Sequence, residues 1–135
     1  MIEIKDIDID SCFETINKWW KFYNKVGINK MMLPGNGNSG LSAFVDDKLV
    51  ASVFIFETNS PIWYCDFLCA DPNYKEKNRQ EVLTTLIDKA VVNCFKKEAL
   101  SVWCTTPYDN VLSKLKDLDY NVEDKKHYII WKTKK

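Results

Sequence analysis

The chain has 135 residues, of which 46% are apolar and 13% aromatic, and 19 basic and 19 acidic side chains give a net charge of zero. A domain of this length buries roughly 65–70% of its unfolded surface, so we expect one domain over residues 1–135. The sequence lacks the basic excess typical of nucleic-acid binders and the run of about 20 apolar residues of a membrane span. We therefore expect neither nucleic acid nor a membrane as a partner.

The N-terminal sequence and the cysteines bear on the compartment. The first ten residues, MIEIKDIDID, are acidic and alternating, which is not the pattern of a secretory signal. Five cysteines form an odd set, which favours a reducing, cytoplasmic location. The sequence has a single histidine, His127, and no Cys-x-x-Cys pair, so we expect no metal site.

The first third of the chain predicts a strand, a helix and a loop. Alternating apolar residues favour a short strand from Ile2, and Ser11 with Glu14 has the spacing of a capping box at a helix start. Apolar residues then recur at helical spacing until Gly27, and a second short helix is expected before Pro34. Residues 34–40 are glycine-rich but lack the lysine and the helix of a phosphate-binding P-loop, which favours a connector.

The remaining two thirds predict a sheet interleaved with helices. Residues 62–70 (IWYCDFLCA) are apolar at almost every position, as expected of a central strand covered on both faces. The other predicted elements are, in order, a hairpin with strands at 41–45 and 49–57, a helix at 77–97, a strand at 99–104, a helix at 107–118 and a strand at 127–131.

This order of elements resembles the GCN5-related N-acetyltransferase (GNAT) family. The resemblance is strongest at residues 62–90, where an apolar strand is followed by Pro72, Tyr74 and a helix whose Leu83, Ile87 and Ala90 match the family's helix face. Lys75 falls at the family's arginine position, and residues 118–120 (LDY) resemble its Leu-Gly-Phe. The resemblance implies an α/β (α+β) fold with a mixed, mostly antiparallel sheet of about six to seven strands flanked by helices.

The resemblance also implies an activity, the transfer of an acetyl group from acetyl-CoA to an amine by direct attack. Such chemistry needs donors for the pyrophosphate at a helix start, a strand edge beside the thioester and a base for the amine. The residues that the resemblance places at the cofactor are Leu68, Cys69 and Ala70 through their backbone, and Lys75, Lys77, Asn78, Arg79 and Gln80 around the pyrophosphate.

Two positions depart from the family pattern. Asn78 and Gln80 replace the small, glycine-like residues of the pyrophosphate loop, although asparagine tolerates left-handed dihedrals better than other residues with side chains. Leu115 stands where the family carries its tyrosine general acid, and leucine has no proton to donate. Tyr108 is then the candidate acid, acting from a different position.

Candidates for the acceptor side follow from charge and aromatic content. Asp66 is the one acid in the apolar strand at 62–70 and is the leading candidate base, ahead of Glu57 and His127. Trp19 and Trp20 are adjacent, so both cannot face one side of a helix equally, and one of them is a candidate for the acceptor pocket. The alternative interpretation of both tryptophans is that they pack in the core. The alternative interpretation of residues 75–80 is that they form a charged, solvated turn without a ligand.

Three functional interpretations stay open at this point. One is an active acetyltransferase with a small-molecule or protein amine as acceptor. Another is a GNAT-like fold that has lost catalysis and serves as a binding or regulatory module, which the loop and Leu115 favour. The last is an unrelated α+β interaction domain, which would lack two strands that separate beside residue 70. The sequence leaves open whether the chain forms a homodimer.

Overall fold

The computed structural model describes residues 1–24, 27–106, 108–123, 125, 130 and 132–134. Among them, five strands form one sheet in the order β1-β2-β3-β4-β5. The strands are β1 (Ile2–Asp6), β2 (Gly40–Val45), β3 (Lys48–Phe56), β4 (Ile62–Ala70) and β5 (Ser101–Cys104). All neighbours pair antiparallel except β4 and β5, which are parallel. The expected mixed, mostly antiparallel sheet is thus confirmed, with fewer strands than six to seven.

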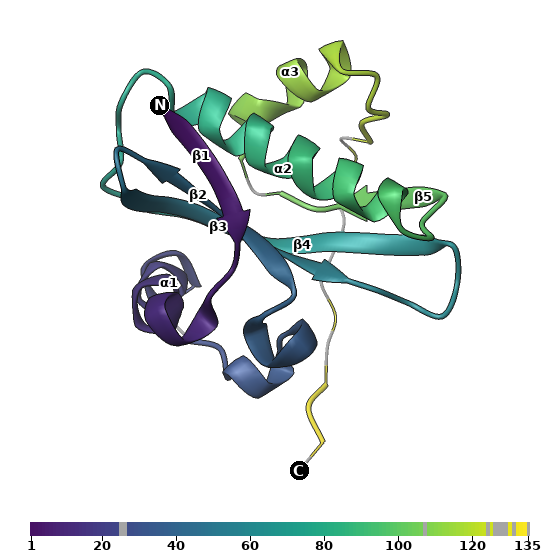
Figure 1. Ribbon diagram of the computed structural model, residues 1–135, viewed down its shortest axis with the longest axis horizontal. Helices are drawn as coiled ribbons and strands as arrows, with labels where there is room; N and C mark the ends of the chain where they lie inside the picture. The colour runs from purple at the N-terminus through teal and green to yellow at the C-terminus, as the bar shows by residue number, and fades with distance from the viewer. Residues whose placement is uncertain (25–26, 107, 124, 126–129, 131, 135) are drawn as a thin grey trace.

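Helices cover both faces of this sheet (Figure 1). Helix α1 (Ile9–Asn24) lies on one face, and α2 (Arg79–Lys96) crosses the other, with α3 (Leu112–Asp117) beside it. Three single-turn 3-10 helices, η1 (Lys30–Met32), η2 (Pro34–Gly37) and η3 (Asp109–Val111), complete the described elements. None of the described helices has both the length and the apolar character needed to cross a bilayer.

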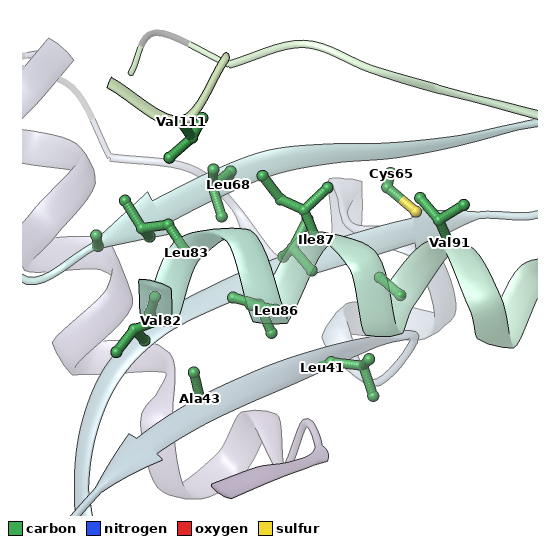
Figure 2. Close-up of a cluster of buried hydrophobic side chains, with 14 of the residues drawn as sticks. Leu41, Ala43, Cys65, Leu68, Val82, Leu83, Leu86, Ile87, Val91 and Val111 are labelled. Atoms are coloured by element: carbon green, nitrogen blue, oxygen red, sulfur yellow. The ribbon is translucent and has the colours of Figure 1, made fainter. Parts of the chain in front are cut away.

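The larger hydrophobic core lies between the sheet and α2 (Figure 2). Leu83 and Leu86 of α2 are fully buried against Leu41, Ala43 and neighbouring residues of the sheet. Their spacing follows the helical period, so one stripe of α2 is buried, while its exposed side carries charged residues together with Val92 and Phe95. Each such leucine contributes roughly 1.5–3 kcal/mol by leaving water, which fixes α2 and therefore the loop that precedes it.

A second core joins α1 to the opposite face of the sheet. It contains Ile16, Trp19 and Trp20 of α1 together with Phe54 of β3 and Cys69 of β4. Trp20 stacks on Phe54 with ring centroids 5.9 Å apart. Both tryptophans are only 6% exposed, because α1 presents a broad apolar face and the sheet twists beneath it.

The start of α1 differs from the predicted capping box. The helix begins at Ile9, two residues before Ser11, whose hydroxyl donates to the Asp8 carbonyl 3.0 Å away. The free N–H of Ile9 instead donates to Oδ1 of Asn38, 3.2 Å away and 29 residues further on. A side chain from the glycine-rich loop therefore satisfies a donor at this helix start, which local spacing in the sequence does not reveal.

Other predicted boundaries differ by a few residues. The expected helix at 107–118 is divided into η3 and α3, and residue 107 itself lies outside the described residues. The final strand expected at 127–131 also falls on residues that are, with the exception of Ile130, outside the described part of the chain. The central strand at 62–70 has the predicted bounds.

Candidate functional site

Strand β4 has a different neighbour along each part of its length, and it is paired on both sides only at Tyr64 and Cys65. It pairs with β3 from Tyr64 to Ala70, but its parallel pairing with β5 runs only from Ile62 to Cys65. Strand β5 ends at Cys104, opposite Cys65, so among the described residues the rest of β4 has no strand on that side. Two parallel strands therefore separate, as expected of a GNAT fold, but they do so after Cys65 rather than beside residue 70. We call the edge of β4 beyond Cys65 the open edge.

A β-bulge marks the point where the open edge begins. Ser52 of β3 faces Cys69, whereas Phe54 faces Asp66, so one residue of β3 opposes two of β4. Phe67, in the bulge, has a φ of 54°, an uncommon conformation for a residue with a bulky side chain. Its ring contacts Trp20 with centroids 5.8 Å apart, which packs the bulge against α1.

Backbone donors of the open edge alternate in direction. The N–H of Asp71 donates to the Val50 carbonyl on β3, and the N–H of the preceding residue, Ala70, points the other way. The N–H of Ala70 meets the Tyr108 hydroxyl at 3.3 Å. Within the predicted backbone set, Ala70 therefore has its N–H directed to the open edge.

Cys69 is placed differently from its two neighbours. Its backbone lies opposite Ser52 on β3, and its side chain is 1% exposed in the core beneath α1. Burial raises the pKa of this thiol to about 12, so it stays protonated at neutral pH. Cys69 packs as a small apolar residue rather than as a nucleophile.

Asp66 lies at the point where β4 and β5 separate. Its Oδ1 accepts hydrogen bonds from the Phe67 N–H at 2.9 Å and from the Thr105 hydroxyl at 2.6 Å. Thr105 directly follows β5, so this bond links the two strands beyond the end of their ladder. Among the described residues no cation pairs with Asp66, and its Oδ2 has no hydrogen-bond partner.

Tyr108 lies in the opening between the strands, in contact with α1 and α2. Its ring meets Tyr23 edge-on at 6.0 Å, and the Arg79 guanidinium lies 5.8 Å from its centroid. Burial first, and the neighbouring Tyr23 second, raise the pKa of the Tyr108 hydroxyl well above its usual range. Tyr108 therefore carries its proton at neutral pH, directly beside the Ala70 N–H.

The loop before α2 is held together by its own side chains. Arg79 donates to the carbonyls of Asp71 and Tyr74, at 2.6 and 2.8 Å, and the Tyr74 hydroxyl donates to Oδ1 of Asn78. Asn78 has φ −88° and ψ 7°, so the left-handed conformation that would favour glycine is not adopted here. Its side chain also does not cap α2.

The start of α2 consequently keeps unsatisfied donors. Arg79 and Val82 donate through their N–H groups to carbonyls of the loop, but those of Gln80 and Glu81 have no acceptor among the described residues. Lys75 and Lys77 are exposed on the same loop and form no ion pair within the described part of the chain. Free N–H groups and two cations at a helix start suit an anion.

The remaining predicted residues lie away from Asp66. Glu57 is paired at 3.5 Å with Lys97, which caps the C-terminal end of α2. Glu57 therefore lies on the α2 face of the sheet. Trp19 and Trp20 are both buried, and Trp20 reaches the site only through Phe67. Leu115 is buried against α2, and His127 lies outside the described residues.

Two residues of the open edge are missing from the sequence-based candidates. Thr105 binds Asp66, and the Tyr23 hydroxyl accepts a hydrogen bond from Arg79 at 3.3 Å. A polar residue directly after a short parallel strand was the signal for Thr105, whereas nothing local marks Tyr23.

A separate hollow beside α2, lined by Thr84, Thr85, Asp88, Lys89, Val92 and Leu118, borders none of these residues. The described residues contain no cluster suited to a metal ion.

Solved structures share this fold. A GNAT-family acetyltransferase from Streptococcus pneumoniae aligns over 100% of both chains with a TM-score of 0.64 and 16% identity. A ribosomal-protein-alanine N-acetyltransferase from Brucella melitensis covers 97% of this chain and 99% of its own, at 16% identity and a TM-score of 0.64. An aminoglycoside acetyltransferase from an uncultured soil metagenomic sample, solved with sisomicin, covers 98% and 97%, at 14% identity and a TM-score of 0.64.

No protein-family model and no curated protein sequence matches the chain. The similarity therefore lies in the three-dimensional arrangement, and it identifies the fold as that of the GNAT acetyltransferases.

Proposed function

We propose that the protein is an N-acetyltransferase that moves the acetyl group of acetyl-CoA to an amine. The observation that carries this proposal is the open edge of β4 after Cys65, in a fold shared with acetyltransferases. The edge offers the backbone donor of Ala70 to an extended ligand, and the start of α2 lies at its end. Both features are fixed by the packing of β4 and α2 in one core.

The chain offers suitable groups to each part of acetyl-CoA. The pyrophosphate would be bound by the N–H groups of Gln80 and Glu81 and by the side chains of Lys75 and Lys77. Arg79 serves this site indirectly, by holding the loop through the carbonyls of Asp71 and Tyr74. The pantetheine chain and the thioester would lie along the open edge, beside the donors of β4.

Asp66 and Tyr108 would handle the protons of the reaction. In the step, the amine nitrogen forms a bond to the acetyl carbon and the carbon–sulfur bond of the thioester breaks. The proton lost by the amine passes to Asp66, directly or through water, and the leaving thiolate takes a proton from Tyr108. The raised pKa of Tyr108 keeps its proton available at neutral pH.

A second candidate function rests on the same contacts. In this structure the Tyr108 hydroxyl accepts the hydrogen bond of the Ala70 N–H. The side chains of Asn78 and Arg79 form hydrogen bonds within the loop before α2, where glycines would leave room for a ligand. A GNAT fold closed in this way would serve as a binding or regulatory module. The two functions differ in whether Tyr108 moves aside for acetyl-CoA.

Amine-dependent release of the coenzyme A thiol from acetyl-CoA tests the enzyme directly. We expect release with at least one amine, and a decrease of about 100-fold or more in the Asp66→Asn variant, the usual contribution of a general base. Glu14→Gln, which removes an exposed carboxylate on α1, is the control and should keep full activity. An unchanged pH–rate profile in Asp66→Asn would exclude Asp66 as the base. If none of the tested amines leads to release of the thiol, the binding module is favoured.

A further inference from the structure

Three large aromatic side chains stay exposed around Asp66. Tyr64 is 44% exposed, Phe67 39% and Trp103 59%. Tyr64 and Trp103 are partners in the parallel ladder between β4 and β5, and Phe67 contacts Phe56 of β3 with centroids 5.9 Å apart. Phe56 is the antiparallel ladder partner of Tyr64, so these aromatic residues occupy neighbouring positions on three adjacent strands. We call Tyr64, Phe67 and Trp103 the aromatic platform.

The platform lies on the face of the sheet that carries α1. Side chains alternate along β4, and Trp63 and Cys65 are buried in the core under α2, so Tyr64 points to the other face. Phe67 contacts Trp20 of α1 and so lies on that face too. Helix α1 covers Phe54 and the bulge but leaves Tyr64 and Trp103 open to solvent.

Asp66 adds one negative charge to this aromatic surface. By alternation its side chain lies on the same face as that of Tyr64, and its hydrogen-bond partner Thr105 occupies the same face as Trp103, two residues earlier. Its Oδ2 is without a partner among the described residues, and no described lysine or arginine neutralises it. Aromatic faces and an open carboxylate both attract a cation and disfavour an anion.

We propose that the aromatic platform is the acceptor site and that it selects a cationic amine on an aromatic or apolar skeleton without a carboxylate. A primary amine is largely protonated near pH 7, since its pKa is close to that of lysine, about 10.4. Its ammonium group would bind Oδ2 of Asp66 while its skeleton lies against Tyr64 and Trp103. It would release one proton to solvent water before the neutral amine attacks, and its second proton would pass to Asp66 as described above. Acetylation of the bound amine depends on the proposed transferase activity, whereas binding of the amine to the platform does not.

A matched pair of probes tests the charge preference. Phenylethylamine and phenylalanine share a ring and an amine, but phenylalanine adds a carboxylate. We expect phenylethylamine to bind at least tenfold more tightly in calorimetry with coenzyme A present, and to have the lower KM in thiol release. Equal binding of the two compounds would overturn the charge preference.

Variants locate the site. Trp103→Ala and Tyr64→Ala should each raise the KM for phenylethylamine about tenfold while leaving the dissociation constant of coenzyme A unchanged. Phe95→Ala removes a ring of 51% exposure from α2, on the other face, and should change neither value. If Trp103→Ala and Phe95→Ala behave alike, the platform is not the acceptor site.

The two proposals fail in distinguishable ways. Calorimetry with phenylethylamine alone needs no catalysis, so binding that Trp103→Ala abolishes would support the platform even if coenzyme A does not bind. Thiol release with other amines that neither Trp103→Ala nor Tyr64→Ala affects would have the opposite meaning. It would support the proposed transferase activity and overturn the proposal that the aromatic platform is the acceptor site.

Discussion

The two halves of β4 are built differently. From Ile62 to Cys65 the strand is paired with β5 and packed under α2, with Trp63 4% and Cys65 1% exposed. From Asp66 to Ala70 the described residues pair it with β3 alone, and this half contains a bulge and turns the Ala70 N–H toward an opening. Residues of both halves are buried in the two cores and stabilise the fold, but in the described part of the chain only the second half lies beside the opening left by the end of β5.

The largest expected effect is on stability in the paired half. Trp63→Ala removes a buried ring from the core and should lower the free energy of unfolding by about 3–5 kcal/mol. Tyr64→Ala, at the next residue, removes a ring that is 44% exposed and should cost much less, about 1 kcal/mol. Urea unfolding measures both, and equal losses would contradict the division between the buried and open faces of β4.

The next largest effect concerns the open half and the proton on Tyr108. Tyr108→Phe keeps the ring between Tyr23 and Arg79 but removes the hydroxyl beside the Ala70 N–H. We expect kcat to fall by about 100-fold or more, the usual contribution of an acid catalyst, while acetyl-CoA binds no more weakly. A kcat equal to that of the unaltered protein would exclude Tyr108 as the proton donor.

A smaller effect is expected where the open edge meets α2. Replacing Lys75 and Lys77 together with glutamate should weaken coenzyme A binding about tenfold, more at low salt, because exposed charges are screened. Lys96→Glu, at the other end of α2, is the matched control and should leave binding unchanged. Calorimetric titration measures both, and equal affinities of all forms would place the pyrophosphate elsewhere.

The smallest effect is a dependence of stability on alkaline pH. Burial raises the pKa of Cys69, in the open half, from 9.0 to about 12. The unfolded chain therefore loses this proton first, so stability falls as pH rises above 9, by about 1 kcal/mol between pH 9 and 10. Unfolding of Cys69→Ala should show a shallower decline over this interval. An equal decline in both proteins would show that Cys69 is accessible to water.

Much of the fold could be predicted because its signals are local. The bounds of β4 follow from nine consecutive residues that are almost all apolar, followed by Asp71 and Pro72. Helix α2 follows from the period of Leu83, Leu86 and Ile87. The start of α1 was less predictable, because the side chain that satisfies Ile9 comes from Asn38, far away in the sequence.

The site was predictable only in part, for the same reason. The composition of β4 makes Asp66 conspicuous, but its partner Thr105 becomes visible only once β5 is known to end at Cys104. The sequence suggested that Asn78 adopts a glycine-like conformation, whereas the hydrogen bond from Tyr74 holds it in an ordinary one. Roles for Trp19, Trp20 and Glu57 at the acceptor stay predictions, and the aromatic platform is the surface nearer to Asp66.

Thermal unfolding with and without coenzyme A tests most directly whether the open half of β4 binds the cofactor. At about 100 times its dissociation constant, a ligand of the folded state stabilises it by about 2.7 kcal/mol, which raises the Tm of a domain this size by several degrees. We predict such a rise, reduced when Lys75 and Lys77 are replaced by glutamate. An unchanged Tm at saturating coenzyme A would contradict the account and favour a GNAT fold that works without the cofactor.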